Sequence, residues 1–168
     1  MSVEQTHEEK ETLTVDVLLP GHEPRTATPL FERTRKELIE REGGRCWVCG
    51  RTAEESGHPL ESHHHPCERS LAEAWDWPRF AQDCKDGKWG PHAQAFNWDA
   101  FLSAKPFDPY TFVDDQTVNG LLVCKDHHTA KGESMHMAPF PFVLWAKYAP
   151  NGYEINPGQH LVHDFPGA

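Results

Sequence analysis

Two pairs of metal-ligand residues, far apart in the sequence, constrain the fold of this chain more than any other feature. Cys46 and Cys49 are separated by two residues, and so are Cys124 and His127. Two pairs with this spacing can converge on one ion, because structural zinc takes four thiolate and imidazole ligands in a tetrahedron. We therefore expect a structural zinc ion bound by Cys46, Cys49, Cys124 and His127.

The cysteine count argues against a disulfide framework. The chain has five cysteines, an odd number, and its first thirty residues are acidic and lack the apolar segment of an export signal. We therefore expect a cytoplasmic location, in which thiols stay reduced and bind metals. Cys67 and Cys84 lie outside the two pairs, and we expect both to pack as small apolar side chains.

Strand-like and helix-like segments alternate along the 168 residues, which predicts one α+β domain. Residues 1–12 are polar and acidic and are expected to form a flexible arm, so the domain should span residues 13–168. Thr28 and Pro29 are typical of a helix start, and Gly43-Gly44 of a helix end. Strands are expected over 13–19, 60–66 and 118–124, with a helix from about residue 126. The extension before Cys46 is thus a strand followed by a helix.

A long segment, residues 67–115, separates the last two expected strands and is read as an insertion between them. Helices are expected there over 70–82 and 94–104. No run approaches the roughly 20 apolar residues that cross a bilayer, so we expect no membrane association.

The charge of the chain disfavours free binding to polyanions. Sixteen basic and 26 acidic side chains give a net charge of −10, and a negative protein is repelled by a phosphate backbone. Basic residues are nevertheless concentrated in residues 31–51, so a local basic patch remains compatible with this balance.

The order of the motifs resembles that of the HNH nucleases. The chain reads Cys-x-x-Cys from Cys46, Leu-Glu-x-His-His from Leu60 and Asn-x-x-x-x-Cys-x-x-His-His from Asn119, within residues 46–66 and 118–136. The stretches Phe-Val-Asp-Asp (112–115), Lys-Gly-Glu-Ser-Met-His (131–136) and Pro-Phe-Pro-Phe-Val-Leu-Trp (139–145) are similar to a bacterial and phage-borne subgroup with a Trp-rich insert.

This resemblance implies a zinc-stabilised ββα-metal core and metal-dependent hydrolysis of phosphodiester bonds in DNA. It implies that His64 is the general base, that His63 and His128 bind the catalytic ion, and that Asn119 fixes the loop carrying the base. An imidazole suits this task because its pKa lies near neutral pH. The ion could be Mg, Mn, Ni or Zn, although two imidazoles suit a transition metal better than Mg. Arg45 and Lys131 are candidate DNA contacts.

Three alternatives stay open at this level. Adjacent strand residues point to opposite faces, so His64 could bind the metal while His65 acts as base. The histidine cluster could instead be a solvated surface feature. The whole chain could be a noncatalytic zinc-stabilised protein that binds another protein; exposed Trp side chains in the insertion, at positions 75, 77, 89 or 98, would favour this function.

Overall fold

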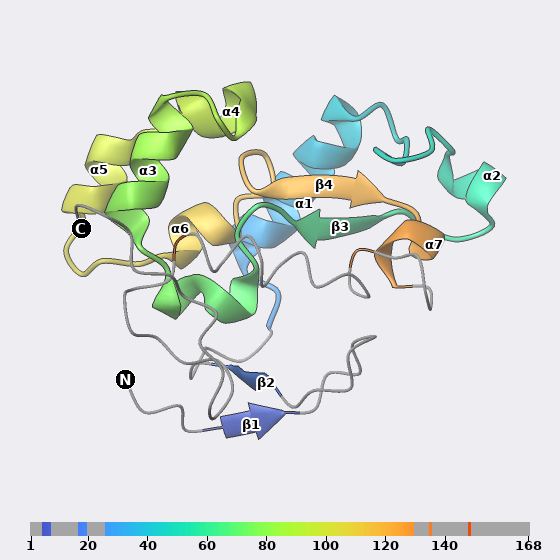
Figure 1. Cartoon of the computed structure of the whole chain (residues 1–168). Helices are drawn as coiled ribbons and strands as arrows, with labels where there is room; N and C mark the ends of the chain where they lie inside the picture. The colour runs from blue at the N-terminus through green and yellow to red at the C-terminus, as the bar shows by residue number, and fades with distance from the viewer. Residues whose placement is uncertain (1–4, 8–16, 20–25, 130–134, 136–147, 149–168) are drawn as a thin grey trace.

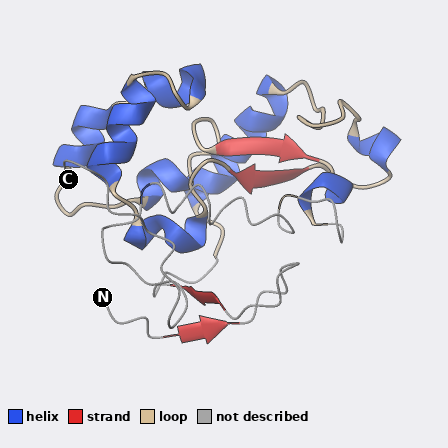
Figure 2. Cartoon of the chain, in the orientation of Figure 1, coloured by secondary structure: helices blue, strands red, loops and turns tan. Residues whose placement is uncertain are grey.

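A computed structural model describes residues 5–7, 17–19, 26–129, 135 and 148. They form short helices and two small two-stranded sheets, an α+β architecture as expected (Figures 1 and 2). The elements in chain order are β1 (Gln5–His7), β2 (Val17–Leu19), α1 (Pro29–Arg41), α2 (Ala53–Ser56), β3 (Glu61–His64), the 3-10 helix η1 (Arg69–Ala74), α3 (Trp77–Lys85), α4 (Gly90–Ala95), α5 (Trp98–Ser103), α6 (Tyr110–Val113), β4 (Gly120–Val123) and α7 (Lys125–His128).

The sheet β3–β4 is the centre from which the candidate site is built. The two strands are antiparallel, with His63 opposite Leu121 and His64 opposite Gly120. Helix α1 packs against β4, and α7 follows β4 directly and packs against β3. A side chain at position 120 would meet the carbonyl oxygen of Gln116 at 2.5 Å, so the start of β4 requires glycine.

Helix α1 begins and ends where its sequence predicts. The Thr28 hydroxyl accepts a hydrogen bond from the backbone N–H of Phe31 at 3.1 Å, and Pro29 occupies the first turn. Gly43 and Gly44 follow the helix with positive φ values of 60° and 64°, which end it. This places Cys46 directly after the turn.

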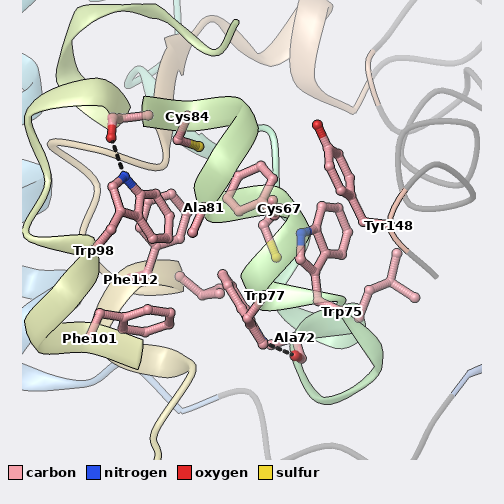
Figure 3. Close-up of a cluster of buried hydrophobic side chains, with 14 of the residues drawn as sticks. Cys67, Ala72, Trp75, Trp77, Ala81, Cys84, Trp98, Phe101, Phe112 and Tyr148 are labelled. Atoms are coloured by element: carbon pink, nitrogen blue, oxygen red, sulfur yellow. Dashed lines mark hydrogen bonds between the residues drawn. The ribbon is translucent and has the colours of Figure 1, made fainter. Parts of the chain in front are cut away.

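The residues between β3 and β4 contain η1 and α3 to α6, and together with Tyr148 they build an aromatic core (Figure 3). Trp75, Trp77 and Trp98 are buried, and Trp89 is partly buried against the same cluster. The indole N–H groups of Trp77 and Trp98 donate to the carbonyls of Ala72 and Ala93. The Trp side chains of the insertion therefore contribute to a core and do not present an exposed surface.

Both helices expected in this segment are interrupted, and the prediction of two continuous helices is wrong. Residues 70–82 divide into η1 and α3 because Trp75 is extended and the Asp76 carboxylate caps α3 by accepting from the N–H of Arg79 at 3.1 Å. Residues 94–104 divide into α4 and α5, since Asn97 caps α5 in the same way. Side-chain caps outweighed the continuous apolar pattern.

Near the N-terminus, residues 5–7 form β1, which pairs antiparallel with β2. Of the flexible arm expected over residues 1–12, the described part is therefore a paired strand; the other residues of that range lie outside the described residues. Of the strand expected over residues 13–19, the described part is β2; residues 13–16 lie outside the described residues.

The described helices are short. The longest of them, α1, has 13 residues, and none in the described part of the chain is long and apolar enough to cross a membrane.

We predict that Phe112→Ala destabilises the protein by about 3–5 kcal/mol, because Phe112 is fully buried and its removal leaves a cavity among Trp77, Phe80 and Trp98. Urea unfolding followed by tryptophan fluorescence measures the loss. Phe107→Ala is the matched control, because 43% of Phe107 is exposed and its truncation should cost less than about 1 kcal/mol. Equal losses in both variants would contradict this account of the core.

Candidate metal centre and the adjacent histidine pocket

The four expected zinc ligands meet at the junction between the turn after α1 and the start of α7. A backbone bond from the N–H of Gly50 to the carbonyl of Cys46, 2.8 Å long, closes the tight turn that carries Cys46 and Cys49. Cys124 lies at the N-terminal cap of α7, and the backbone N–H of His127 donates to its carbonyl at 3.0 Å. Local backbone structure thus presents each pair, and the strand β4 brings the pairs together.

The four ligand atoms all lie within 4.8 Å of one another, close enough to share one ion. Cys46 Sγ lies 3.7 Å and Cys124 Sγ 3.1 Å from His127 Nδ1, and the sulfurs of Cys49 and Cys124 are 4.0 Å apart. Zinc bonds of about 2.3 Å to sulfur and 2.0 Å to nitrogen place tetrahedral ligands about 3.5–3.8 Å apart. These four residues can therefore hold a metal ion, and their chemistry is that of a structural zinc site.

Electrostatics at this cluster favour the thiolate form of Cys49. The Arg51 guanidinium donates from Nε to Cys49 Sγ at 3.3 Å and lowers the pKa of that thiol to about 6. Burial has the opposite effect at Cys67, which lies outside the cluster, and raises the pKa of its thiol well above the ordinary value. Cys67 and Cys84 are both buried in the aromatic core, as expected of apolar packing.

Beside this centre lies a pocket of about 310 Å³ that three of the expected site histidines share. His63 and His64 come from the end of β3, and His128 from the end of α7. The remaining walls come from the segment before α1 and its first turn, from β3, from the start of η1 and from the residue after α6: Thr26, Ala27, Phe31, Ser62, Glu68, Arg69 and Asp114. The pocket is thus built from both the central sheet and the insertion.

His63 and His128 face each other across the sheet edge. Their ring centroids are 5.4 Å apart in an edge-to-face arrangement, and His63 is buried. The Nδ1 atom of His128 lies 2.5 Å from Glu61 Oε2. A carboxylate at Nδ1 orients an imidazole and makes its other nitrogen, Nε2, the more basic metal ligand.

His64 has a different environment, formed by Phe31 and Asp114. Its ring stacks on that of Phe31 at 5.6 Å, and its Nε2 atom is 3.8 Å from Asp114 Oδ1. Asp114 is itself fixed, since Arg69 Nε and Thr28 Oγ1 each donate to its carboxylate at 3.0 Å. Burial alone would raise the pKa of Asp114, but His64, Arg69 and Thr28 together hold it below its usual value.

Asn119 lies at the junction of the two strand ends with the insertion and is fully buried. Its side-chain oxygen accepts from the N–H of Cys67 at 2.9 Å, and its amide donates to the carbonyls of Cys67 and Val113 at 2.8 and 3.0 Å. Its backbone carbonyl accepts from the N–H of His65 at 3.2 Å. Asn119 therefore fixes the chain that leaves β3 just beyond His64.

The other residues singled out from the sequence lie elsewhere. His65 is not among the residues that line the pocket, and its ring lies 6.2 Å from that of Trp89. Arg45 is on the turn of the metal centre, where it donates to the carbonyl of Gly50 at 2.9 Å and lies 3.6 Å from Glu55. Lys131 lies outside the described residues.

Sequence reasoning missed three charged residues of the pocket: Glu68, Arg69 and Asp114. Asp114 belongs to the Phe-Val-Asp-Asp stretch, which carried part of the resemblance but no assigned role. Glu68 and Arg69 follow the histidines closely in the sequence. This proximity is the one local signal that could have indicated a role for these two residues. Their convergence depends on folding, because Arg69 and Asp114 are 45 positions apart in the sequence.

Comparisons with protein-family models, with curated proteins and with solved structures found no match for this chain. Its function must therefore be argued from the geometry of its own residues.

We predict that purified protein contains one zinc ion and that Cys124→Ser loses it, because serine oxygen is a poor substitute for a thiolate ligand. Zinc content by atomic emission and the melting temperature measure the effect. Removal of zinc by a chelator should lower the melting temperature of the wild type, since ligand binding contributes to folding free energy. Cys84→Ala is the control and should retain zinc; loss of zinc in this variant as well would argue against the four-residue site.

We predict that Asn119→Ala costs about 3 kcal/mol of unfolding free energy, because it leaves the buried N–H of Cys67 without its acceptor. Urea unfolding at full zinc content measures this. Asn97→Ala, which removes only the exposed cap of α5, should cost about 1 kcal/mol. A loss for Asn119→Ala no greater than that of the control would contradict its anchoring role.

Proposed function

We propose that this protein is a metal-dependent nuclease of the HNH type that hydrolyses phosphodiester bonds in DNA. The observation that carries the proposal is that His63, His64 and His128 line one pocket, next to a Cys3His centre. In the arrangement of that type, two strands and a helix hold the reacting groups; in this chain His63 and His64 lie on β3, which pairs with β4, and His128 lies on α7. The resemblance in motif order is the second support.

Within this proposal, His63 and His128 hold the catalytic ion. The contact between Glu61 and His128 Nδ1 leaves Nε2 as the metal-binding nitrogen, which is the usual outer contact of a ligating histidine. When bound, a divalent ion supplies Lewis-acid stabilisation of the charge that develops on the phosphate and on the leaving oxygen. Two imidazoles favour a transition metal over Mg.

His64 is the general base in this proposal. Its ring is in the pocket lining, stacked on Phe31 and with Nε2 3.8 Å from Asp114 Oδ1. A neutral imidazole in this position can accept a proton from the attacking water. His65 lies beside Trp89 and is not among the residues that line the pocket. This supports the assignment of His63 as metal ligand and His64 as base over the alternative in which His64 binds the metal and His65 is the base.

Arg69 is the phosphate contact that best fits this reaction. Its guanidinium lies in the pocket wall, 4.6 Å from the ring centre of Tyr110, and Asp114 holds its Nε atom. Arg45 is instead engaged at the turn of the metal centre. A planar guanidinium fixed on two sides loses little conformational freedom when it binds a phosphate.

The test is cleavage of supercoiled plasmid by zinc-loaded protein with Mg, Mn, Ni or Zn added, and with no added metal. We predict cleavage that requires an added divalent ion and falls by at least about 100-fold in His64→Ala, in line with the usual contribution of a general base. Zinc content and melting temperature should not change in this variant.

The matched control is His58→Ala, because His58 is exposed and lies outside the pocket lining. It should cleave at the wild-type rate. Cleavage by His64→Ala at that same rate would show that His64 is not the base.

One surface feature supports the alternative function, noncatalytic binding of another protein. Trp47 and Val48, on the turn between the two cysteines, are 60% and 47% exposed, and exposed aromatic side chains are enriched where proteins bind each other. The acidic net charge points in the same direction. Absence of cleavage by zinc-loaded protein in every metal would make a noncatalytic protein-binding function the better proposal.

A further inference from the structure

The pocket contains an acidic side chain to which the proposed reaction gives no role. Glu68 precedes η1, lines the pocket together with His63 and His128, and has a side chain that is only 15% exposed. Withdrawing a carboxylate from water is unfavourable unless a positive charge or hydrogen bonds compensate it. A carboxylate in this position therefore needs a physical explanation.

The carboxylate of Glu68 is fixed at one oxygen and directed towards the histidines at the other. Oε2 accepts a hydrogen bond from the backbone N–H of Arg69 at 3.2 Å. Oε1 lies 3.9 Å from His63 Nδ1. The first contact holds the side chain in place at the start of η1, and the second brings an oxygen donor next to a nitrogen donor.

The separation of 3.9 Å between Glu68 and His63 suits two ligands of one ion better than a hydrogen bond. A hydrogen bond would need about 2.7–3.2 Å. Two donors that each lie about 2.1 Å from a shared ion are between about 3.0 and 4.2 Å apart, according to the angle at the ion. The observed distance falls in that interval.

The charges of the pocket lining also favour a cation. The side chain of Asp114 forms an ion pair with Arg69. Among the described residues of the lining there is no second Lys or Arg that could pair with Glu68. With neutral imidazoles the lining therefore carries two carboxylates against one guanidinium. Such a pocket attracts a divalent cation and repels a phosphate until that cation is bound.

We propose that Glu68 is a third protein ligand of the pocket ion, together with His63 and His128. The inference rests on the proposed function, because it extends the ligand set of the ion that the reaction uses. Two imidazoles and one carboxylate leave positions open for water and phosphate and suit Mn, Fe(II), Co, Ni or Zn. Within the described residues, the Cys3His centre is the one group of three or more ligand atoms that all lie within 4.8 Å of one another, so a shared ion at the pocket requires the three side chains to move closer together.

The test is a titration of zinc-loaded protein with Mn²⁺, with free Mn²⁺ followed by its electron paramagnetic resonance signal. The wild type should bind one Mn²⁺ in addition to its zinc. Glu68→Gln keeps the size of the side chain and an oxygen to cap η1 but removes the charge; it should weaken Mn²⁺ binding at least about tenfold. His128→Ala should weaken it as well.

Glu73→Gln is the matched control, because it removes the same charge at an exposed position of η1, the 3-10 helix that Glu68 caps. It should bind Mn²⁺ within about twofold of the wild type. Zinc content and far-UV circular dichroism show that each variant is folded.

Two results would overturn the inference. If Glu68→Gln binds Mn²⁺ like the wild type while His128→Ala does not, the ion is held without Glu68 and the proposed function stands. If the wild type binds no Mn²⁺ beyond its zinc, the three-residue site is wrong, and plasmid cleavage in the other metals decides the proposed function separately.

Discussion

The convergence of the four Cys3His ligands is the constraint on which the rest of the site depends. The turn after α1 and the start of α7 are about 75 residues apart in sequence, and Cys49 and Cys124 bring their sulfur atoms to within 4.0 Å. Because β4 ends at Val123, directly before Cys124, a metal ion at this point also fixes the strand that pairs with β3. The orientation of α7, and with it of His128, follows from that junction.

The insertion completes the pocket and is itself stabilised by an aromatic core that also includes Tyr148. Its two ends are joined to the sheet by Asn119, whose side chain holds Cys67 and Val113 at once. Asp114, at the end of α6, then contacts Thr28 before α1, His64 on β3 and Arg69 on η1. The insertion therefore contributes the charged wall of a pocket whose histidines come from the small sheet and α7.

The charge distribution bears on the proposed nuclease function. With a net charge of −10, the protein gains little from long-range attraction to DNA. Within the pocket, Arg69 is compensated by Asp114 and the lining is acidic through Glu68. Under the proposed function, a bound divalent ion would supply most of the affinity for a phosphate and Arg69 a further contact, so that metal binding and substrate binding would be linked.

The sequence by itself determined the features that rest on neighbouring residues. The ligand spacing of the two metal-binding pairs, the Thr28 cap with Pro29, and the glycines that end α1 all act over a few residues, so their pattern can be read directly. The adjacent histidines also indicated the right stretch of β3. Only the tertiary structure decided that Glu68, Arg69 and Asp114 share the histidine pocket, and that the expected helices of the insertion are broken. The physical reason is that these outcomes depend on contacts between distant segments, such as the 86 residues between Thr28 and Asp114, and on caps that compete with a continuous apolar pattern.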